Sequence, residues 1–182
     1  MVQALVLVDI QNDYFPGGAM ELSGSVAAGS QAARLLEAFR LARLPVVHIQ
    51  HLSLRPGATF FLPGTAGASV SACVAPLPGE TVFQKHAPNS FRETPLLDHL
   101  RGLGATRLTV AGMMTHMCID ATVRAAFDLG FEVTLAGDAC ATRGLSFGGR
   151  AVPAEQVQAA FLAALDGVFA RVVDAGRVLR GL

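Results

Sequence analysis

The chain has 182 residues, of which 52% are hydrophobic and 15% are charged. Its 14 Lys and Arg residues balance 14 Asp and Glu residues, and without a basic stripe this composition argues against a nucleic-acid partner. Charges or glycines interrupt every apolar run before it reaches the length of a membrane span, and the N-terminus lacks a basic leader, so we expect a cytoplasmic protein.

Short apolar runs alternate with helical patterns, which is typical of a parallel sheet covered by helices on both faces. We expect strands over residues 4–8, 46–49, 81–83, 107–111, 131–136 and 168–173. Helices are expected over residues 25–41, 95–101, 117–129 and 153–166. The order of these elements predicts one domain, residues 1–182, with a Rossmann-like, doubly wound α/β/α architecture around a six-stranded parallel sheet.

Two segments between these elements are candidates for a lid and an interface. Residues 51–80 are rich in Pro and Gly, and a long irregular loop in a compact domain is usually functional. Phe60 and Phe61 within it would then line a pocket. Residues 143–153 form the second segment. Because an apolar chain with little net charge should hide surface, we expect a homodimer or larger homo-oligomer.

Polar residues follow two of the predicted strands. Asp9 ends the first strand, and Lys85 follows the third. Ligands in doubly wound sheets bind at the carboxyl ends of strands, so these side chains are candidates for chemistry. Each also has a simpler interpretation, because Asp favours polar turns and a lysine after a strand is usually solvated.

Cys118 lies where a predicted strand leads into a predicted helix. Backbone N–H groups and the helix dipole at such a position stabilise a thiolate, and the same N–H groups can face a developing oxyanion. The alternative is that Cys118 is a small buried hydrophobic residue. Cys73 and Cys140 have no clear helix start behind them. An odd number of cysteines favours free thiols over a disulfide framework.

A metal site has weaker support in the sequence. His48 and His51 are three residues apart, and on a strand this spacing would place their rings on opposite faces, so a shared metal would need irregular backbone. The sequence contains no Cys-x-x-Cys or His-Glu-x-x-His pattern. We therefore expect neither a catalytic metal nor another cofactor.

Three short motifs together resemble the isochorismatase-like cysteine hydrolases. They are the Val-Asp-Ile-Gln-Asn-Asp start around Asp9, Lys85 after the third strand, and Gly112-x-x-Thr115-x-x-Cys118. The resemblance runs from residue 4 to about 173 and implies the isochorismatase-like hydrolase fold. It also implies that Cys118 is the nucleophile, that Asp9 takes its proton, and that Lys85 lies between them and lowers the thiol pKa.

The same resemblance makes further predictions about the site. The Met113–Met114 peptide is expected to be cis, and the backbone N–H groups of Met114 and Cys118 are expected to form an oxyanion hole. The substrate is a small molecule. We expect its pocket to include Gln11, Tyr14, His51, Phe91 and Thr115.

Departures from the family pattern bear on the substrate. Nicotinamidases carry a metal site on an Asp-x-His pattern, whereas this chain has His48-Ile49-Gln50-His51 in the corresponding stretch. Some relatives that cleave vinyl ethers lack the cysteine, so Cys118 favours cleavage of an amide, ureido or imide C–N bond through a thioester. Alternatives are vinyl ether hydrolysis with Asp9 as general acid, a non-catalytic small-molecule-binding oligomer, or a redox thiol.

Overall fold

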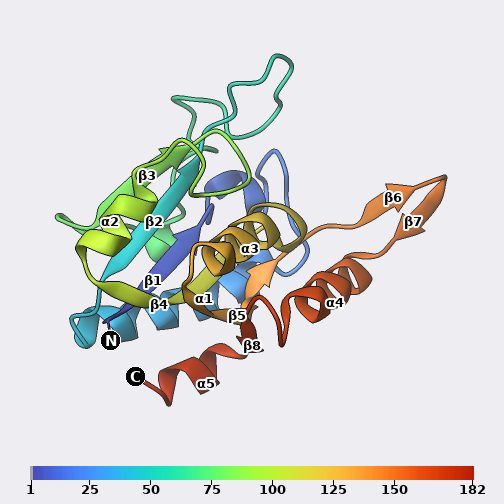
Figure 1. Cartoon of the computed structure of the whole chain (residues 1–182). Helices are drawn as coiled ribbons and strands as arrows, with labels where there is room; N and C mark the ends of the chain where they lie inside the picture. The colour runs from blue at the N-terminus through green and yellow to red at the C-terminus, as the bar shows by residue number, and fades with distance from the viewer. Residues whose placement is uncertain (1) are drawn as a thin grey trace.

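A computed structural model describes residues 2–182, which fold around a sheet of six parallel strands (Figure 1). The strands are β1 (Val2–Val8), β2 (Val46–His51), β3 (Thr81–Lys85), β4 (Ala105–Met113), β5 (Glu132–Ala141) and β8 (Arg171–Val173). Their order in the sheet is β3-β2-β1-β4-β5-β8. This order confirms the predicted doubly wound, six-stranded parallel sheet.

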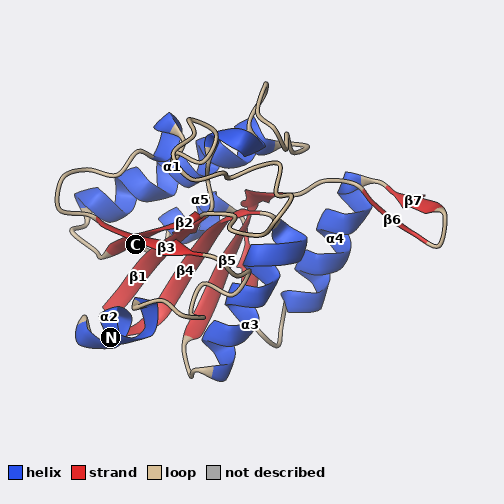
Figure 2. Cartoon of the chain, turned by 90° about the horizontal axis from the view of Figure 1, so that it is seen from above, coloured by secondary structure: helices blue, strands red, loops and turns tan. Residues whose placement is uncertain are grey.

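Helices cover both faces of this sheet (Figure 2). The helices are α1 (Ser25–Leu41), α2 (Leu96–Gly102), α3 (Asp120–Asp128), α4 (Ala154–Leu165) and α5 (Ala175–Leu179). Helices α1 and α5 pack on one face, and α2, α3 and α4 pack on the other. Within residues 2–182, every helix is too short or too polar to cross a bilayer.

Strand β1 shows why the apolar runs are continuous. Val6 and Val8 pack beneath α2 and α3, whereas Leu5 and Leu7 pack against α1. Successive side chains of a strand point to opposite faces, so a strand covered on both sides is apolar throughout. Each such side chain contributes about 1.5–3 kcal/mol when it is fully buried.

The strand order reverses beside β1, which has β2 on one side and β4 on the other. In doubly wound folds this switch point, at the carboxyl ends of the strands, is where ligands bind. β2 and β3 both extend beyond their predicted ends. His51 and Lys85 are consequently the last residues of these strands and lie directly opposite each other.

One hairpin and one helix were not predicted. Residues 143–153 contain β6 (Leu145–Phe147) and β7 (Arg150–Val152), an antiparallel hairpin that extends away from the sheet and its helices (Figures 1 and 2). Gly148 and Gly149 at its tip both have positive φ, as a tight two-residue hairpin turn requires. This Gly-Gly pair was the sequence signal for the hairpin. The short C-terminal helix α5 was also missed.

Candidate active site

Asp9, Lys85 and Cys118 converge at the carboxyl edge of the sheet. Asp9 follows β1, Lys85 ends β3, and Cys118 lies in the π-helical turn Thr115–Ile119 between β4 and α3. The Lys85 Nζ atom is 2.8 Å from Asp9 Oδ2. The Cys118 sulfur and a carboxylate oxygen of Asp9 lie within 4.8 Å of each other. The fold thus brings together the three residues singled out in the sequence.

Asp9 is a buried carboxylate with spare hydrogen-bonding capacity. Its backbone has a φ of 53°, unusual for a residue other than glycine, and its N–H donates to the Ile49 carbonyl. The side chain is fully buried, and among residues 2–182 nothing donates a hydrogen bond to Oδ1. An unpaired buried carboxylate oxygen is costly. Asp9 is therefore well placed to accept a proton from the nearby Cys118 thiol.

Lys85 is the only lysine in the chain, and its side chain is fully buried. Besides Asp9, its Nζ atom contacts His51 Nδ1 at 3.1 Å and donates to the Ala87 carbonyl at 3.0 Å. Burial is the largest single influence and favours the neutral amine, but the negative charge of Asp9, together with Cys118 and hydrogen bonds to both residues, raises the pKa of Lys85. Lys85 is thus a cation held in one position by several acceptors.

The surroundings of Cys118 favour its thiol form. Burial, followed by the negative charge of Asp9, raises the pKa of the Cys118 thiol, although the positive charge of Lys85 opposes both. Lys85 thus acts in the predicted direction, against the combined effect of burial and Asp9. Formation of the thiolate therefore requires a base, and Asp9 is the carboxylate beside it.

The turn that carries Cys118 depends on close backbone packing. Gly112 has a φ of 140°, and a Cβ atom there would collide with the carbonyl of Val8 on β1. The Met113–Met114 peptide is cis, as the family resemblance predicts. The Met114 carbonyl accepts hydrogen bonds from the N–H groups of Met117 and Ile119, closing the π-helical turn. Turns of this kind often occur at functional sites.

A small cavity of about 140 Å³ has Cys118 among its lining residues. Aromatic side chains of Tyr14, Phe60 and Phe61 form much of its wall, and Tyr14 packs on Phe61 with ring centroids 4.5 Å apart. The polar lining residues are His51, Ser53, Arg55 and His86. Residues 51–61, which form the first part of the candidate lid over residues 51–80, thus supply a large part of the cavity. Arg55 and His86 were not predicted as pocket residues; His86 directly follows Lys85 in the sequence, whereas no pattern marked Arg55.

Three other predicted pocket residues have structural partners instead. Gln11 donates from Nε2 to the His51 carbonyl at 2.9 Å, and its Oε1 accepts from the His51 N–H. The Thr115 hydroxyl donates to the Ala141 carbonyl. Phe91 stacks on Phe131 within the core, with ring centroids 6.1 Å apart. These contacts place Gln11 behind the cavity wall, and place Thr115 and Phe91 in the packing of the domain.

The donor atoms of Asp9, His51 and Cys118 all lie within 4.8 Å of one another, a spacing that is also compatible with metal ligation. However, Lys85 Nζ contacts both Asp9 and His51, so an ammonium already supplies the positive charge between them. His48 does not join the cluster, because its Nε2 atom contacts Glu80 at 3.0 Å. This donor set does not fit a metal ion while Lys85 is present.

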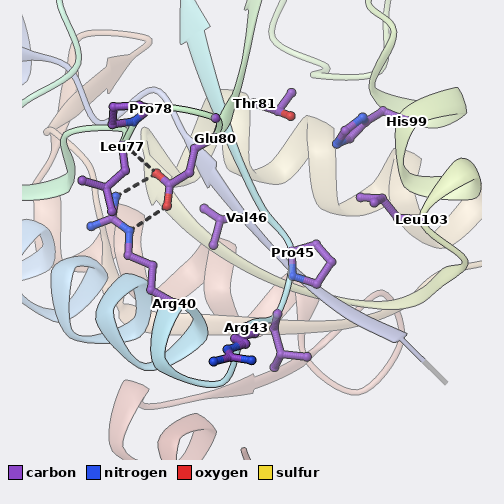
Figure 3. A pocket seen from close by; sticks show the side chains of 12 residues that line it. Arg40, Arg43, Pro45, Val46, Leu77, Pro78, Glu80, Thr81, His99 and Leu103 are labelled. Atoms are coloured by element: carbon purple, nitrogen blue, oxygen red, sulfur yellow. Dashed lines mark hydrogen bonds and ion pairs between the residues drawn. The ribbon is translucent and has the colours of Figure 1, made fainter.

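A wider groove of about 670 Å³ lies at the opposite, amino edge of the sheet (Figure 3). Arg40 on α1 forms two 2.7 Å contacts with Glu80 there, which also accepts from the Leu77 N–H. The hydrogen bonds from Arg40 lower the pKa of Glu80 to about 2. These charged groups satisfy each other and join α1 to the start of β3, which is a structural role.

Comparisons of the sequence and of the structure with known proteins agree on one family. A family model for the isochorismatase domain matches residues 3–176. The uncharacterized isochorismatase family protein YddQ of Bacillus subtilis is 49% identical over 172 residues, covering 94% of this chain and 96% of that protein. A crystal structure from Oleispira antarctica, assigned as an isochorismatase hydrolase, superposes with a TM-score of 0.95 at 48% identity, covering 99% and 97% of the two chains. Ureidoacrylate amidohydrolase RutB of Methylobacterium radiotolerans is 28% identical over 156 residues, covering 68% and 60%.

Proposed function

Because the chain belongs to the isochorismatase family, we propose that it is a cysteine-dependent hydrolase of small molecules that cleaves an amide, ureido or imide C–N bond. The observation that carries this proposal is the buried carboxylate of Asp9. It has an oxygen without a hydrogen-bond donor, and it lies within 4.8 Å of the Cys118 sulfur. A thiol beside a base is the arrangement that nucleophilic catalysis requires.

In the proposed reaction, Cys118 passes its proton to Asp9 as the sulfur attacks the carbonyl carbon. The N–H groups of Met114 and Cys118 stabilise the tetrahedral oxyanion. The C–N bond then breaks, and Asp9 returns the proton to the leaving amine. Asp9 next removes a proton from water, which attacks the thioester and releases the acid and the Cys118 thiol. Lys85 holds the position and charge of Asp9 through both half-reactions.

Two observations favour a C–N bond and a covalent route. An amidohydrolase is among the relatives, which gives a precedent for cleavage of an amide-like bond. Vinyl ether hydrolysis would use Asp9 as a general acid and would need no sulfur. A buried thiol next to a free carboxylate oxygen favours attack by Cys118.

The test is a turnover screen of small amides, ureides and cyclic imides with four proteins. We expect wild type to hydrolyse at least one of these classes. Cys118→Ala and Asp9→Asn should each lose activity by at least about 10³-fold. The first removes the nucleophile, and the second removes the base that accepts its proton. Cys140→Ala, which alters another buried cysteine, should retain it. Wild-type turnover by Cys118→Ala or Asp9→Asn would refute the mechanism.

We also propose that the chain assembles into a homo-oligomer through the β6–β7 hairpin. Phe147 near its tip is 88% exposed. A two-stranded hairpin is marginally stable alone in water, so a projecting hairpin with an exposed aromatic residue gains stability from a second copy. Light scattering should give a multiple of the monomer mass, and Phe147→Asp should reduce it. A monomeric wild type at micromolar concentration would refute the proposal.

A further inference from the structure

His51 is held rigidly between the catalytic lysine and the cavity. The side chain of Gln11 fixes its backbone through two hydrogen bonds, from the His51 N–H at 2.8 Å and to the His51 carbonyl at 2.9 Å. Its ring lies opposite Lys85 in the pairing of β2 with β3. The same ring lines the cavity that reaches Cys118. His51 is therefore ordered before any substrate enters.

The protonation of this ring follows from its neighbour. Lys85 Nζ lies 3.1 Å from Nδ1, and an ammonium can only donate, so Nδ1 must accept. Burial, together with the positive charge of Lys85, lowers the pKa of His51 to about 4, so the imidazole is neutral at pH 7. A neutral ring that accepts at Nδ1 carries its proton at Nε2. His51 consequently offers one N–H donor beyond its contact with Lys85.

Arg55 brings a positive charge to the mouth of the cavity. It lines the cavity together with His86, and both side chains are exposed. The negative charge of Asp9 is already matched by Lys85. A volume of about 140 Å³ is well below the roughly 300–1,000 Å³ of typical drug-sized pockets, so the part of the substrate that enters must be compact.

We propose that His51 is a substrate-binding residue whose Nε2–H group donates to a carboxylate oxygen near the scissile C–N bond. Arg55 supplies the matching positive charge at the cavity mouth. The substrate is then a compact amide whose acyl part carries a carboxylate. This inference rests on the proposed function, because the acyl part must sit beside Cys118.

Two substitutions distinguish the role of Nδ1 from that of Nε2 in the His51 ring. In His51→Asn the side-chain oxygen can replace Nδ1 as the acceptor for Lys85, but the donor at Nε2 is lost. In His51→Gln the amide N–H₂ reaches the Nε2 position and keeps a donor toward the cavity. Each is made in a Cys118→Ala background so that binding is measured without turnover. The probes are malonamate, a compact amide with a carboxylate, and butanamide, in which an uncharged ethyl group replaces the carboxylate.

Isothermal titration calorimetry should show malonamate binding more tightly than butanamide to the Cys118→Ala parent. His51→Asn should weaken malonamate binding by about 10-fold, whereas His51→Gln should stay within about 3-fold of the parent. Butanamide binding should be the same in all three proteins. Arg55→Gln should weaken malonamate alone, increasingly so at low salt.

Three results would overturn the inference: equal binding of the two probes to the parent, unchanged malonamate binding in His51→Asn, or unchanged malonamate binding in Arg55→Gln. If His51 acted only by accepting a hydrogen bond from Lys85, the pattern would be reversed. His51→Gln would then weaken malonamate binding, and His51→Asn would leave it unchanged. The proposed function fails separately, if wild type forms no covalent adduct at Cys118 while the binding pattern holds.

Discussion

The Nζ atom of Lys85 lies 2.8 Å from Oδ2 of Asp9, and both side chains are completely shielded from solvent. Each charge would be very costly to bury alone, so the two residues depend on each other. The pair also leaves the cluster electrically neutral when Cys118 is a thiol. Transfer of the thiol proton to Asp9 preserves that neutrality, because the negative charge moves from oxygen to sulfur beside the same lysine.

This dependence predicts a large loss of stability in Lys85→Met. Removing the ammonium leaves the buried carboxylate of Asp9 uncompensated, which should cost about 3–5 kcal/mol of unfolding free energy. The double variant Asp9→Asn, Lys85→Met should recover a substantial part of this loss. Urea denaturation at pH 7 measures both. Equal stability of Lys85→Met and wild type would show that the pair is not energetically coupled.

Asp9→Asn should make the Cys118 thiol more reactive towards an alkylating reagent, although the same substitution should reduce turnover. A neighbouring negative charge raises a thiol pKa, so Asp9→Asn should lower the pKa of Cys118 while Lys85 still favours the thiolate. Alkylation by iodoacetamide, followed by mass spectrometry across pH, should therefore reach its midpoint at lower pH in Asp9→Asn. The exposed Cys73 serves as the internal control. A midpoint that stays the same or moves to higher pH would contradict this electrostatic account.

The ion pair of Glu80 with Arg40 should give a stability that depends on pH. Arg40 lowers the pKa of Glu80 from an ordinary value of 4.5 to about 2 in the folded protein. The resulting stabilisation is present above pH 4.5 and is lost as pH falls from 4.5 toward 2. Glu80→Gln should therefore cost about 2 kcal/mol at pH 7 and progressively less below pH 4.5.

Denaturant titrations between pH 7 and pH 3 measure this difference. Glu93→Gln is the matched control, because Glu93 contacts Arg92 only at 3.5 Å and both side chains are largely exposed. That exposed pair should contribute almost nothing at any pH. If Glu80→Gln differed from wild type by the same amount at pH 7 and pH 3, the ion pair would not be the cause.

Gly112 should be intolerant of any side chain. Its φ of 140° is available only to glycine, and a Cβ atom would meet the carbonyl of Val8 on the adjacent strand. We expect Gly112→Ala to destabilise the fold by more than about 3 kcal/mol. At Gly102, which ends α2, a Cβ atom would meet nothing within 4 Å, so Gly102→Ala should change stability by less than about 1 kcal/mol. Thermal unfolding compares them, and similar melting temperatures would contradict the packing argument.

Much of the fold followed from periodicity in the sequence. Helix α1 spans residues 25–41 as predicted, because its apolar face is regular and Pro45 follows closely. Strand ends were less predictable. Polar residues such as His51 and Lys85 interrupt the apolar pattern but continue the backbone ladder, since pairing between β2 and β3 extends to both. The hairpin β6–β7 lacked an apolar run altogether.

The positions of Asp9, Lys85 and Cys118 could be inferred because each follows or ends an element at one edge of the sheet. The pocket was harder to predict. Phe91 and Phe61 are both phenylalanines in irregular segments, yet one stacks in the core and the other lines the cavity. The place of Phe61 depends on the path of residues 51–80, and long-range contacts such as the hydrogen bond from the Phe61 N–H to Asp13 fix that path.

The central claim is that Cys118 forms a covalent intermediate, and mass spectrometry tests it most directly. Wild-type protein is mixed with a hydrolysed substrate, quenched with acid during turnover and digested. The account predicts that the peptide containing Cys118 gains the mass of the acyl group, and that Cys118→Ala shows neither the adduct nor turnover. An unmodified Cys118 in the wild type, together with full turnover by Cys118→Ala, would contradict it.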